Sequence, residues 1–124
     1  MRSTTIYRRG VIVLVPFPYT DQSGSKRRPA LILSSTAYNS RRDEIIFAPI
    51  TSNLSTGQVD DTLLSAWATA GLPKPSVVKG VLASIEKSLI IRVLGELSSG
   101  DLKRVEKTFA NILGLAVPLP PPSP

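Results

Sequence analysis

The sequence contains no cysteine and no histidine. The lack of cysteine excludes disulfides, thiolate nucleophiles and zinc sites built on cysteine. The lack of histidine removes the commonest general base and the commonest metal ligand. Any catalysis by this chain must therefore use other side chains.

Long apolar runs are also missing. The longest, Val11 to Val15, ends at Pro16, whereas a bilayer span needs about 20 apolar residues. Arg8 and Arg9 precede this run as in a signal peptide, but the run is too short and no small-residue cleavage site follows it. We therefore expect no membrane association and a cytoplasmic location.

Acidic residues are few, since 9 Asp and Glu stand against 15 Lys and Arg, which gives a net charge of +6 and a pI near 10.1. This balance favours an acidic partner, either nucleic acid or an acidic protein. The acidic pairs Asp43-Glu44 and Asp60-Asp61 make poor two-metal ligands, because neighbouring strand residues point to opposite faces. No glycine-rich phosphate loop is present, which argues against nucleotide hydrolysis.

The apolar pattern predicts a mainly β domain with one C-terminal helix (α+β), built as a small barrel or sandwich with the helix packed alongside. Polar connections are predicted over residues 18–29, 37–43 and 52–61, and one or two helical turns over residues 63–70. Trp67, in that last segment, is expected in the core or in a dimer interface, with base stacking as the alternative. Strands are predicted over residues 10–17, 30–35, 45–51, 76–81, 83–85 and 89–97.

The C-terminal helix has the clearest signals. Ser98 or Ser99 can cap it, Asp101 complements the dipole of its first turn, and Gly114 supplies the C-cap. An apolar stripe that we expect to be core consists of Leu102, Val105, Phe109, Ile112 and Leu113. We expect residues 1–115 to form a single domain and residues 116–124 to be a proline-rich, extended tail.

Two strand ends carry polar groups that suit a phosphodiester. Lys26, Arg27 and Arg28 precede one predicted strand, and Thr51 ends another. If these strands are neighbours, Arg28 and Thr51 face one spot, and a guanidinium fork matches two phosphate oxygens. The alternative is that Arg28 holds a surface carboxylate and that Thr51 is an ordinary β-branched strand residue.

Four segments together resemble the MazF/PemK-like toxins of type II toxin–antitoxin systems. They are GVIVLVPFP from Gly10, RPAL from Arg28, PITS from Pro49 and SIEK from Ser84, in the order of that family. The resemblance, from about residue 7 to residue 115, implies an SH3-like barrel of the MazF/PemK/CcdB type and a homodimer. It also implies a sequence-specific endoribonuclease that cleaves single-stranded RNA, mRNA in the first place, without a metal or other cofactor. An acidic cognate antitoxin would hold this activity in check.

The resemblance also implies roles for individual residues. Arg28 matches the arginine that contacts the scissile phosphate, and Thr51 matches the catalytic hydroxyl. In the mechanism that we hypothesise, the 2′-OH of RNA attacks phosphorus, Arg28 stabilises the developing charge and Thr51 helps to fix the phosphate. The general base is left unassigned among Glu86, a distant Asp and Arg28. Substrate-binding candidates are Lys26, Arg27, Ser52, Asn53, Ser84, Glu86 and Lys87; no residue is assigned to a metal.

The sequence also departs from the family pattern. Glu86 replaces an aspartate, no acidic residue occurs over residues 80–83, and Ser25-Lys26-Arg27 replaces a Ser-Glu-Gln segment. These departures favour one alternative, a catalytically weak RNA-binding module. Another alternative is a protein-directed toxin that poisons an enzyme such as a topoisomerase, against which the presence of both Arg28 and Thr51 argues.

Overall fold

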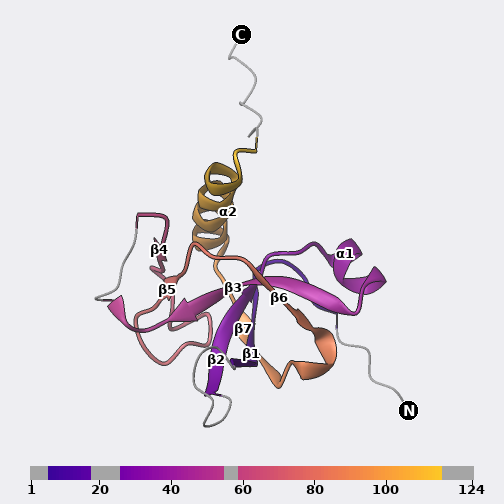
Figure 1. Cartoon of the computed structure of the whole chain (residues 1–124). Coiled ribbons are helices and arrows are strands. Elements are labelled where there is room, and N and C mark those ends of the chain that lie inside the picture. The colour runs from indigo at the N-terminus through magenta and orange to yellow at the C-terminus, as the bar shows by residue number, and fades with distance from the viewer. Residues whose placement is uncertain (1–5, 18–25, 55–58, 116–124) are drawn as a thin grey trace.

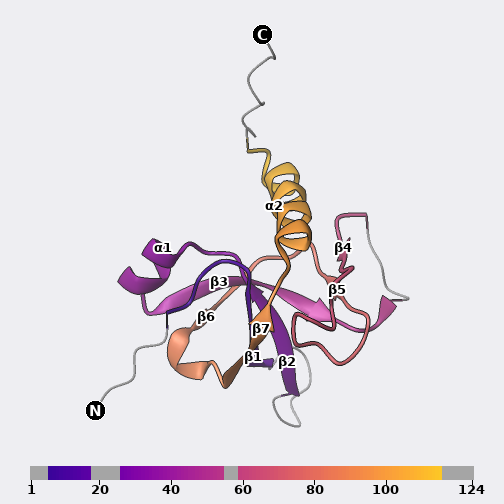
Figure 2. The ribbon, with the colours of Figure 1, turned by 180° about the vertical axis from the view of Figure 1, so that it is seen from behind.

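The computed structural model of the chain describes residues 6–17, 26–54 and 59–115. Its strands form one curled antiparallel sheet, a half-barrel, from which the C-terminal helix rises (Figures 1 and 2). The strands are β1 Val11–Phe17, β2 Lys26–Ile32, β3 Glu44–Thr51, β4 Thr62–Leu63, β5 Val77–Val78, β6 Ala83–Glu86 and β7 Arg92–Glu96. The helices are α1 Thr36–Arg41, the 3-10 turn η2 Lys87–Leu89 and α2 Ser99–Leu113.

The architecture confirms the predicted fold class, a mainly β protein with a C-terminal helix. The order of the strands is β4-β5-β3-β2-β1-β7, and β6 also pairs with β3. β3 is the organising strand because it contacts β6 near its start and β5 at its end. Ile46 lies opposite Ser84, and Thr51 lies opposite Val77. Residues of β6 therefore lie beside the start of β3, whereas residues next to β5 lie beside its end.

At β1 the sheet is buried on both faces, which explains the continuous apolar run of this strand. Ile12 belongs to a core cluster that includes Val105 and Phe109 of α2. Its neighbour Val13 points into a second cluster on the other face, where it joins Ile45 of β3. A strand covered on both faces needs apolar residues at every position rather than at alternate ones. The strand predicted over residues 10–17 is thereby confirmed.

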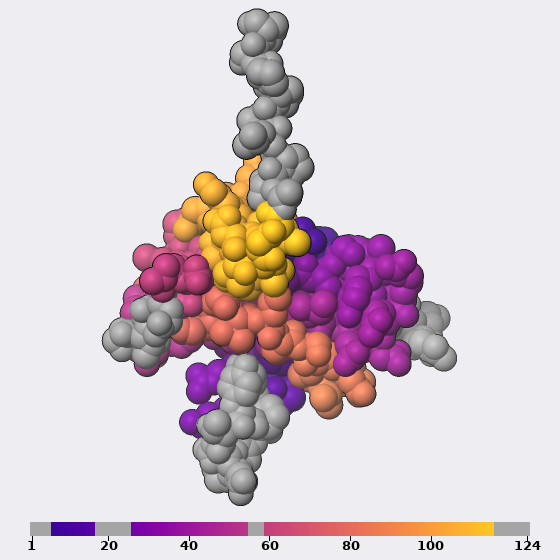
Figure 3. Space-filling model, turned by 45° about the horizontal axis from the view of Figure 1, so that its top comes forward, coloured from indigo at the N-terminus to yellow at the C-terminus, as the bar shows by residue number. Residues whose placement is uncertain are grey.

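The C-terminal helix begins and ends as predicted. The Ser98 hydroxyl accepts a hydrogen bond from the Asp101 amide (3.2 Å), and Gly114 ends the helix at φ 68°. The predicted core stripe holds only in part, because Ile112 and Leu113 are 37% and 52% exposed. In Figure 3 the last turns of α2 (yellow) project from the body between the pink side and the purple side. The apolar residues of these last turns therefore remain partly at the surface.

Helix α1 lies where the sequence predicted only a polar connection over residues 37–43, so that prediction is wrong. Ser35 caps the helix by accepting a hydrogen bond from the Tyr38 amide (3.2 Å). The Asn39 side chain, 2% exposed, donates to the carbonyls of Tyr7 (2.9 Å) and Ser34 (3.1 Å). A helix held by polar contacts carries no apolar stripe, and hydrophobic periodicity therefore gave no sign of it.

β2 also differs from its prediction, since it begins at Lys26 inside the expected loop and ends at Ile32 rather than at residue 35. Its first residues, Lys26 to Pro29, pair only with β1, and β3 joins from Ala30 onward. A strand with one neighbour tolerates charged residues and a proline that cannot donate a hydrogen bond. The charges that marked a loop in the sequence mark a strand edge in the structure.

The predicted helical turns over residues 63–70 are confirmed in part: β4 ends at Leu63, and one turn follows in which the Ala70 amide donates to the Ala66 carbonyl (3.2 Å). The Leu72 amide bonds to the Trp67 carbonyl (3.1 Å), and Gly71 takes a positive φ of 90°. Trp67 is half-buried against the core cluster that contains α2. The strand predicted over residues 89–97 is shorter than expected, because η2 precedes it and β7 begins only at Arg92.

Some predictions fall outside the described residues, namely most of the loop over residues 18–29, residues 55–58 of the loop over 52–61, and the tail over 116–124. Within the described part of the chain, no helix has the length and apolar character needed to cross a bilayer.

Candidate functional site

A pocket of about 250 Å³ lies where the start of β2 and the end of β3 meet the segment that precedes β5. In Figure 1 that segment loops between the lower end of β2 and the left-hand end of β3. The antiparallel order β5-β3-β2 brings these three parts of the chain together. The residues that line the pocket are Arg27, Arg28, Pro29, Ile50, Thr51, Ser52, Leu72, Pro73, Lys74 and Ser76.

The pocket carries positive charge that the described residues do not neutralise. Arg27, Arg28 and Lys74 are exposed, and their side chains form no ion pair or hydrogen bond with any described residue. Some other arginines of the chain are paired, for example Arg8 with Glu96 at 2.9 Å. None of the described residues that line the pocket is acidic. Three exposed cations with no counter-ion among the described residues are a charge arrangement that suits an anion.

Thr51 adds a hydroxyl in a defined orientation. Its Oγ1 accepts a hydrogen bond from the Asn53 amide (3.1 Å), which is a local turn typical of threonine. A hydroxyl that accepts in this way still has its own proton to donate. Thr51 is half-buried at the end of β3, so β3 fixes the position of this donor. Arg28 and Thr51 together can hold the oxygens of a phosphodiester.

The third wall of the pocket, residues 72–76, was missed by the sequence reasoning. Leu72 and Ser76 are buried, and the Ser76 hydroxyl donates to the Lys74 carbonyl (2.8 Å). The Leu64 amide bonds to the Ser76 carbonyl (3.0 Å), which ties the wall to the end of β4. A lone lysine between Pro73 and Pro75 was the only signal in the sequence, and using it required knowing that β5 pairs with the end of β3.

Asp101 of α2 anchors the turns that lead into this wall. Its carboxylate, 1% exposed, accepts hydrogen bonds from the Ser65 amide (3.2 Å), the Ser65 hydroxyl (2.8 Å) and the Ala66 amide (2.9 Å), and it pairs with Arg104. Burial alone would raise the pKa of Asp101, but these hydrogen bonds outweigh it and lower the pKa from 3.8 to about 2. Asp101 thus does more than complement the helix dipole.

Two glycines let the same turns approach β7. A Cβ on Gly95 would lie 2.1 Å from the Ala70 carbonyl oxygen, and one on Gly71 would lie 2.2 Å from the Leu94 carbonyl oxygen. Because both neighbours are backbone atoms, neither can move aside locally. The turn that precedes residues 72–76 therefore packs directly, backbone to backbone, against β7.

The remaining substrate-binding candidates divide into two groups. Ser52 lines the pocket, whereas Lys26 and Asn53 are exposed at the adjoining strand ends and do not line it. Ser84, by contrast, lies opposite Ile46 of β3. At about 3.3 Å per residue, the five positions from Ile46 to Thr51 separate them by roughly 17 Å along the strand.

Glu86 and Lys87 also lie toward the start of β3. Glu86 pairs in register with Glu44 and lines a polar depression together with Arg41, Arg42, Asp43 and Glu44. The Lys87 ammonium donates to the Asn39 carbonyl (2.6 Å), so it fastens η2 to α1. Within one copy of the chain, therefore, Glu86 is not placed to take a proton beside Arg28 and Thr51.

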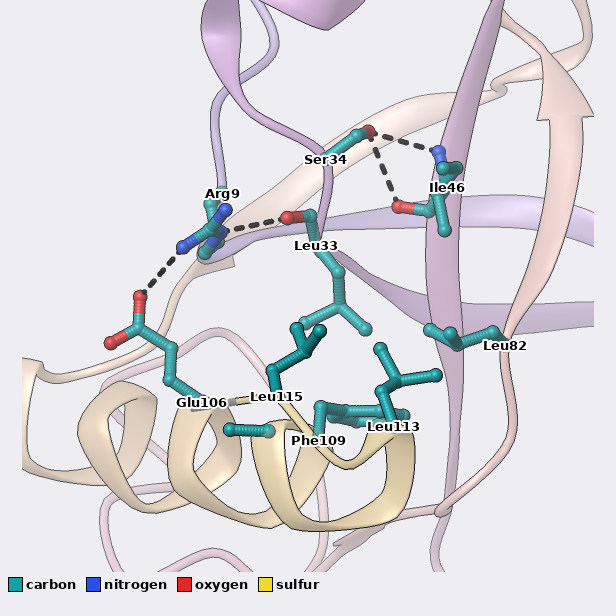
Figure 4. Close-up of a pocket in the computed structure, with 10 residues that line it drawn as sticks. Arg9, Leu33, Ser34, Ile46, Leu82, Glu106, Phe109, Leu113 and Leu115 are labelled. Atoms are coloured by element: carbon teal, nitrogen blue, oxygen red, sulfur yellow. Dashed lines mark hydrogen bonds and ion pairs between the residues drawn. The ribbon is translucent and has the colours of Figure 1, made fainter. Parts of the chain in front are cut away.

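A second cavity, of about 350 Å³, has a different character (Figure 4). It lies between the end of α2 and the sheet, and Arg9 at its edge bonds to the Leu33 carbonyl (2.7 Å) and to Glu106 (3.2 Å). Its apolar lining consists of Leu33, Ile46, Leu82, Phe109, Ala110, Leu113 and Leu115. Such a lining does not suit a phosphodiester, so the cationic pocket is the candidate site for one.

Comparison with known proteins places this geometry in a family. The family described as "PemK-like, MazF-like toxin of type II toxin-antitoxin system" matches residues 8–113. A curated relative, endoribonuclease MazF6 of Mycobacterium tuberculosis, is 29% identical over 100 residues, which cover 79% of this chain and 88% of the relative.

Solved structures agree with this result. A MazE–MazF crystal structure from Deinococcus radiodurans is 28% identical and has a TM-score of 0.74. The match covers 90% of this chain and all of that one. An endoribonuclease in complex with its cognate antitoxin from a mycobacterial species matches with a TM-score of 0.72 and 18% identity, over 93% of this chain and all of that one; at this identity the likeness shows the fold alone. The chain therefore belongs to the family of PemK-like, MazF-like toxins of type II toxin–antitoxin systems.

Proposed function

We propose that this chain is the toxin of a type II toxin–antitoxin pair and acts as a metal-independent, sequence-specific endoribonuclease on single-stranded RNA, mRNA in the first place. The observation that carries this proposal is the pocket in which Arg28 and Thr51 meet beside further cations and no described acidic residue. The curated relative at 29% identity is named an endoribonuclease, which supports the same activity.

In the proposed reaction the 2′-OH of RNA attacks the adjacent phosphorus. A P–O2′ bond forms and the P–O5′ bond breaks, which leaves a 2′,3′-cyclic phosphate and a 5′-OH end. The proton of the 2′-OH passes to solvent, and the 5′ oxygen regains one from solvent. Arg28 neutralises the charge that develops on the phosphoryl oxygens, and the Thr51 hydroxyl donates a hydrogen bond to one of them.

The pocket supplies charge and orientation rather than a strong base. Arginine has a pKa above about 12 and accepts protons poorly near neutral pH. Glu86 lies at the other end of β3 in the same chain. The general base stays unassigned, and we expect a modest turnover that depends on positioning and on charge stabilisation.

The same cations give the antitoxin a place to bind. An extended acidic segment laid along Arg27, Arg28 and Lys74 would replace the RNA phosphates. The antitoxin and RNA should then exclude one another. Detection of a ternary complex of toxin, antitoxin and RNA at low salt would contradict this part of the proposal.

We also expect a homodimer in the cytoplasm, where the RNA substrate is found. Exposed apolar side chains on the η2–β7 segment, such as Ile91 and Val93, give a second copy an apolar surface to cover. The mass of the protein in solution, measured by light scattering, tests the dimer.

One alternative has a specific observation in its favour. An RNA-binding module that does not cleave would need the cations but no base, and no described acidic residue lines the pocket. A protein-directed toxin, the other alternative, would not need Arg28 and Thr51 in one pocket.

The test is incubation of a long end-labelled RNA with the protein in excess EDTA. Cutting at defined sites, with 2′,3′-cyclic phosphate ends, would support the ribonuclease. Binding without cutting would support the RNA-binding module. If the protein binds none of a varied set of RNAs, the result would favour the protein-directed toxin.

A further inference from the structure

We propose that Lys74 binds a second phosphate of the RNA chain, next to the phosphate that Arg28 and Thr51 hold. This inference rests on the proposed function and adds a contact to it. Lys74 stands on the wall formed by residues 72–76, whereas Arg28 and Thr51 belong to the sheet. The pocket between them thus receives positive charge from two sides.

The backbone of Lys74 is held firmly at the edge of the pocket. Pro73 and Pro75 each fix φ near −65° on either side of it. The Ser76 hydroxyl donates to the Lys74 carbonyl (2.8 Å), and both Leu72 and Ser76 are buried. A lysine on such a fixed base loses little further backbone freedom when its ammonium contacts a ligand.

The Lys74 ammonium is also not used within the described structure. It makes no ion pair or hydrogen bond with a described residue, although it lies only five positions before Lys79. Lys79 is paired with Asp61 at 2.8 Å and is less than a quarter exposed, which is the pattern of a structural lysine. The contrast marks Lys74 as the lysine of this segment that is available to an external anion.

The pocket, of about 250 Å³, reaches from Arg28 and Thr51 on the sheet to Lys74 on the facing wall. A single strand that places one phosphate at Arg28 and Thr51 can therefore continue toward the Lys74 ammonium. A compact ammonium on a flexible stem binds a phosphate as a point charge, without the fixed geometry that the Arg28 guanidinium demands.

The test separates binding from cleavage by using a set of 2′-O-methyl RNAs of varied sequence, which lack the attacking hydroxyl. Their affinity is measured by fluorescence anisotropy over a range of salt concentrations for the unchanged protein and for Lys74→Gln, Lys74→Arg and Lys103→Gln. Lys103 is an exposed lysine of α2 that does not line the pocket, so its variant is the matched control for charge. Thermal unfolding of each variant checks that the fold is intact.

If Lys74 contacts a phosphate, Lys74→Gln weakens binding about fivefold at low salt. It also reduces the slope of log affinity against log salt by about 0.7, the value for one phosphate of a single strand. Lys74→Arg and Lys103→Gln keep the original slope. An unchanged slope for Lys74→Gln, in a protein that binds and cuts RNA, would overturn this inference alone. Failure of the unchanged protein to bind RNA would overturn both the inference and the proposed function.

Discussion

The Asn53 amide donates a hydrogen bond to Oγ1 of Thr51 at 3.1 Å, immediately after β3 ends. This contact occupies one lone pair of the hydroxyl and leaves its proton for another acceptor. Because Thr51 lines the same pocket as Arg28, that acceptor can be an oxygen of a phosphate bound there. The end of β3 thus presents a hydroxyl donor to the pocket.

Replacement of Thr51 by valine tests the hydroxyl, because valine keeps the shape and removes the donor. We expect the single-turnover rate of RNA cleavage to fall about 10²-fold, as for the loss of one donor to a developing oxyanion. The affinity for RNA should change little, and Thr51→Ser should retain most of the rate. A valine variant that cuts RNA at the original rate would remove Thr51 from the mechanism.

Asp101 should be a major determinant of stability. Asp101→Asn removes the negative charge that pairs with Arg104. The same carboxylate accepts hydrogen bonds from two backbone amides and one hydroxyl. We expect the free energy of unfolding in urea to fall by about 2 to 4 kcal/mol, since a buried carboxylate loses its charge and a hydrogen bond to a charged group contributes about 1.5 to 3 kcal/mol. Glu106→Gln, which breaks the exposed pair with Arg9, should cost less than about 1 kcal/mol. Equal effects of the two variants would contradict this account of Asp101.

The pH dependence of stability gives a second measure of the same carboxylate. The pKa of Asp101 is lowered to about 2 in the folded chain from an ordinary value of 3.8. Its contribution to the free energy of unfolding, about 2 kcal/mol in all, is therefore complete above about pH 5 and is lost as the pH falls through 3.8 and then through about 2. Urea unfolding between pH 5 and pH 2 should show a smaller loss of stability in Asp101→Asn than in the unchanged protein. Parallel curves for the two proteins would show that Asp101 does not titrate in this window.

A comparison of two glycines tests the close contact behind the pocket. Gly95→Ala places a Cβ 2.1 Å from the Ala70 carbonyl oxygen and should destabilise the protein by about 1 to 3 kcal/mol. Gly100, in the first turn of α2, has no heavy atom within 4 Å of the position that a Cβ would take, so Gly100→Ala should be neutral or stabilising by up to about 1 kcal/mol. Thermal unfolding measures both variants. A Gly95→Ala protein as stable as the Gly100→Ala protein would mean that this contact can relax.

The elements that the sequence predicted best are those whose apolar residues repeat regularly. β1 and β3 are buried on both faces, and α2 has a capping serine at one end and a C-cap glycine at the other. α1 could not be predicted in this way, because buried polar contacts of Asn39 hold it. The start of β2 was hidden by its charges, which are acceptable only because that part of the strand lies at an edge.

The candidate site shows a similar division. The neighbourhood of Arg28 and Thr51 was expected from the two motifs, and β2 and β3 do pair. The positions of the other candidates depend on strand pairing and register, which sequence patterning does not set. The pairing brings Lys74 into the pocket and leaves Ser84 near the start of β3. The catalytic and substrate-binding roles of these residues stay predictions.

Cleavage of end-labelled RNA in excess EDTA by Arg28→Ala and Arg41→Ala is the most direct test of the proposed function. Both variants remove one exposed arginine, but only Arg28 lines the cationic pocket. We predict that Arg28→Ala loses site-specific cutting by at least about 10²-fold, whereas Arg41→Ala cuts at the same sites as the unchanged protein. Undiminished cutting by a folded Arg28→Ala protein would contradict the proposal that this pocket holds the scissile phosphate.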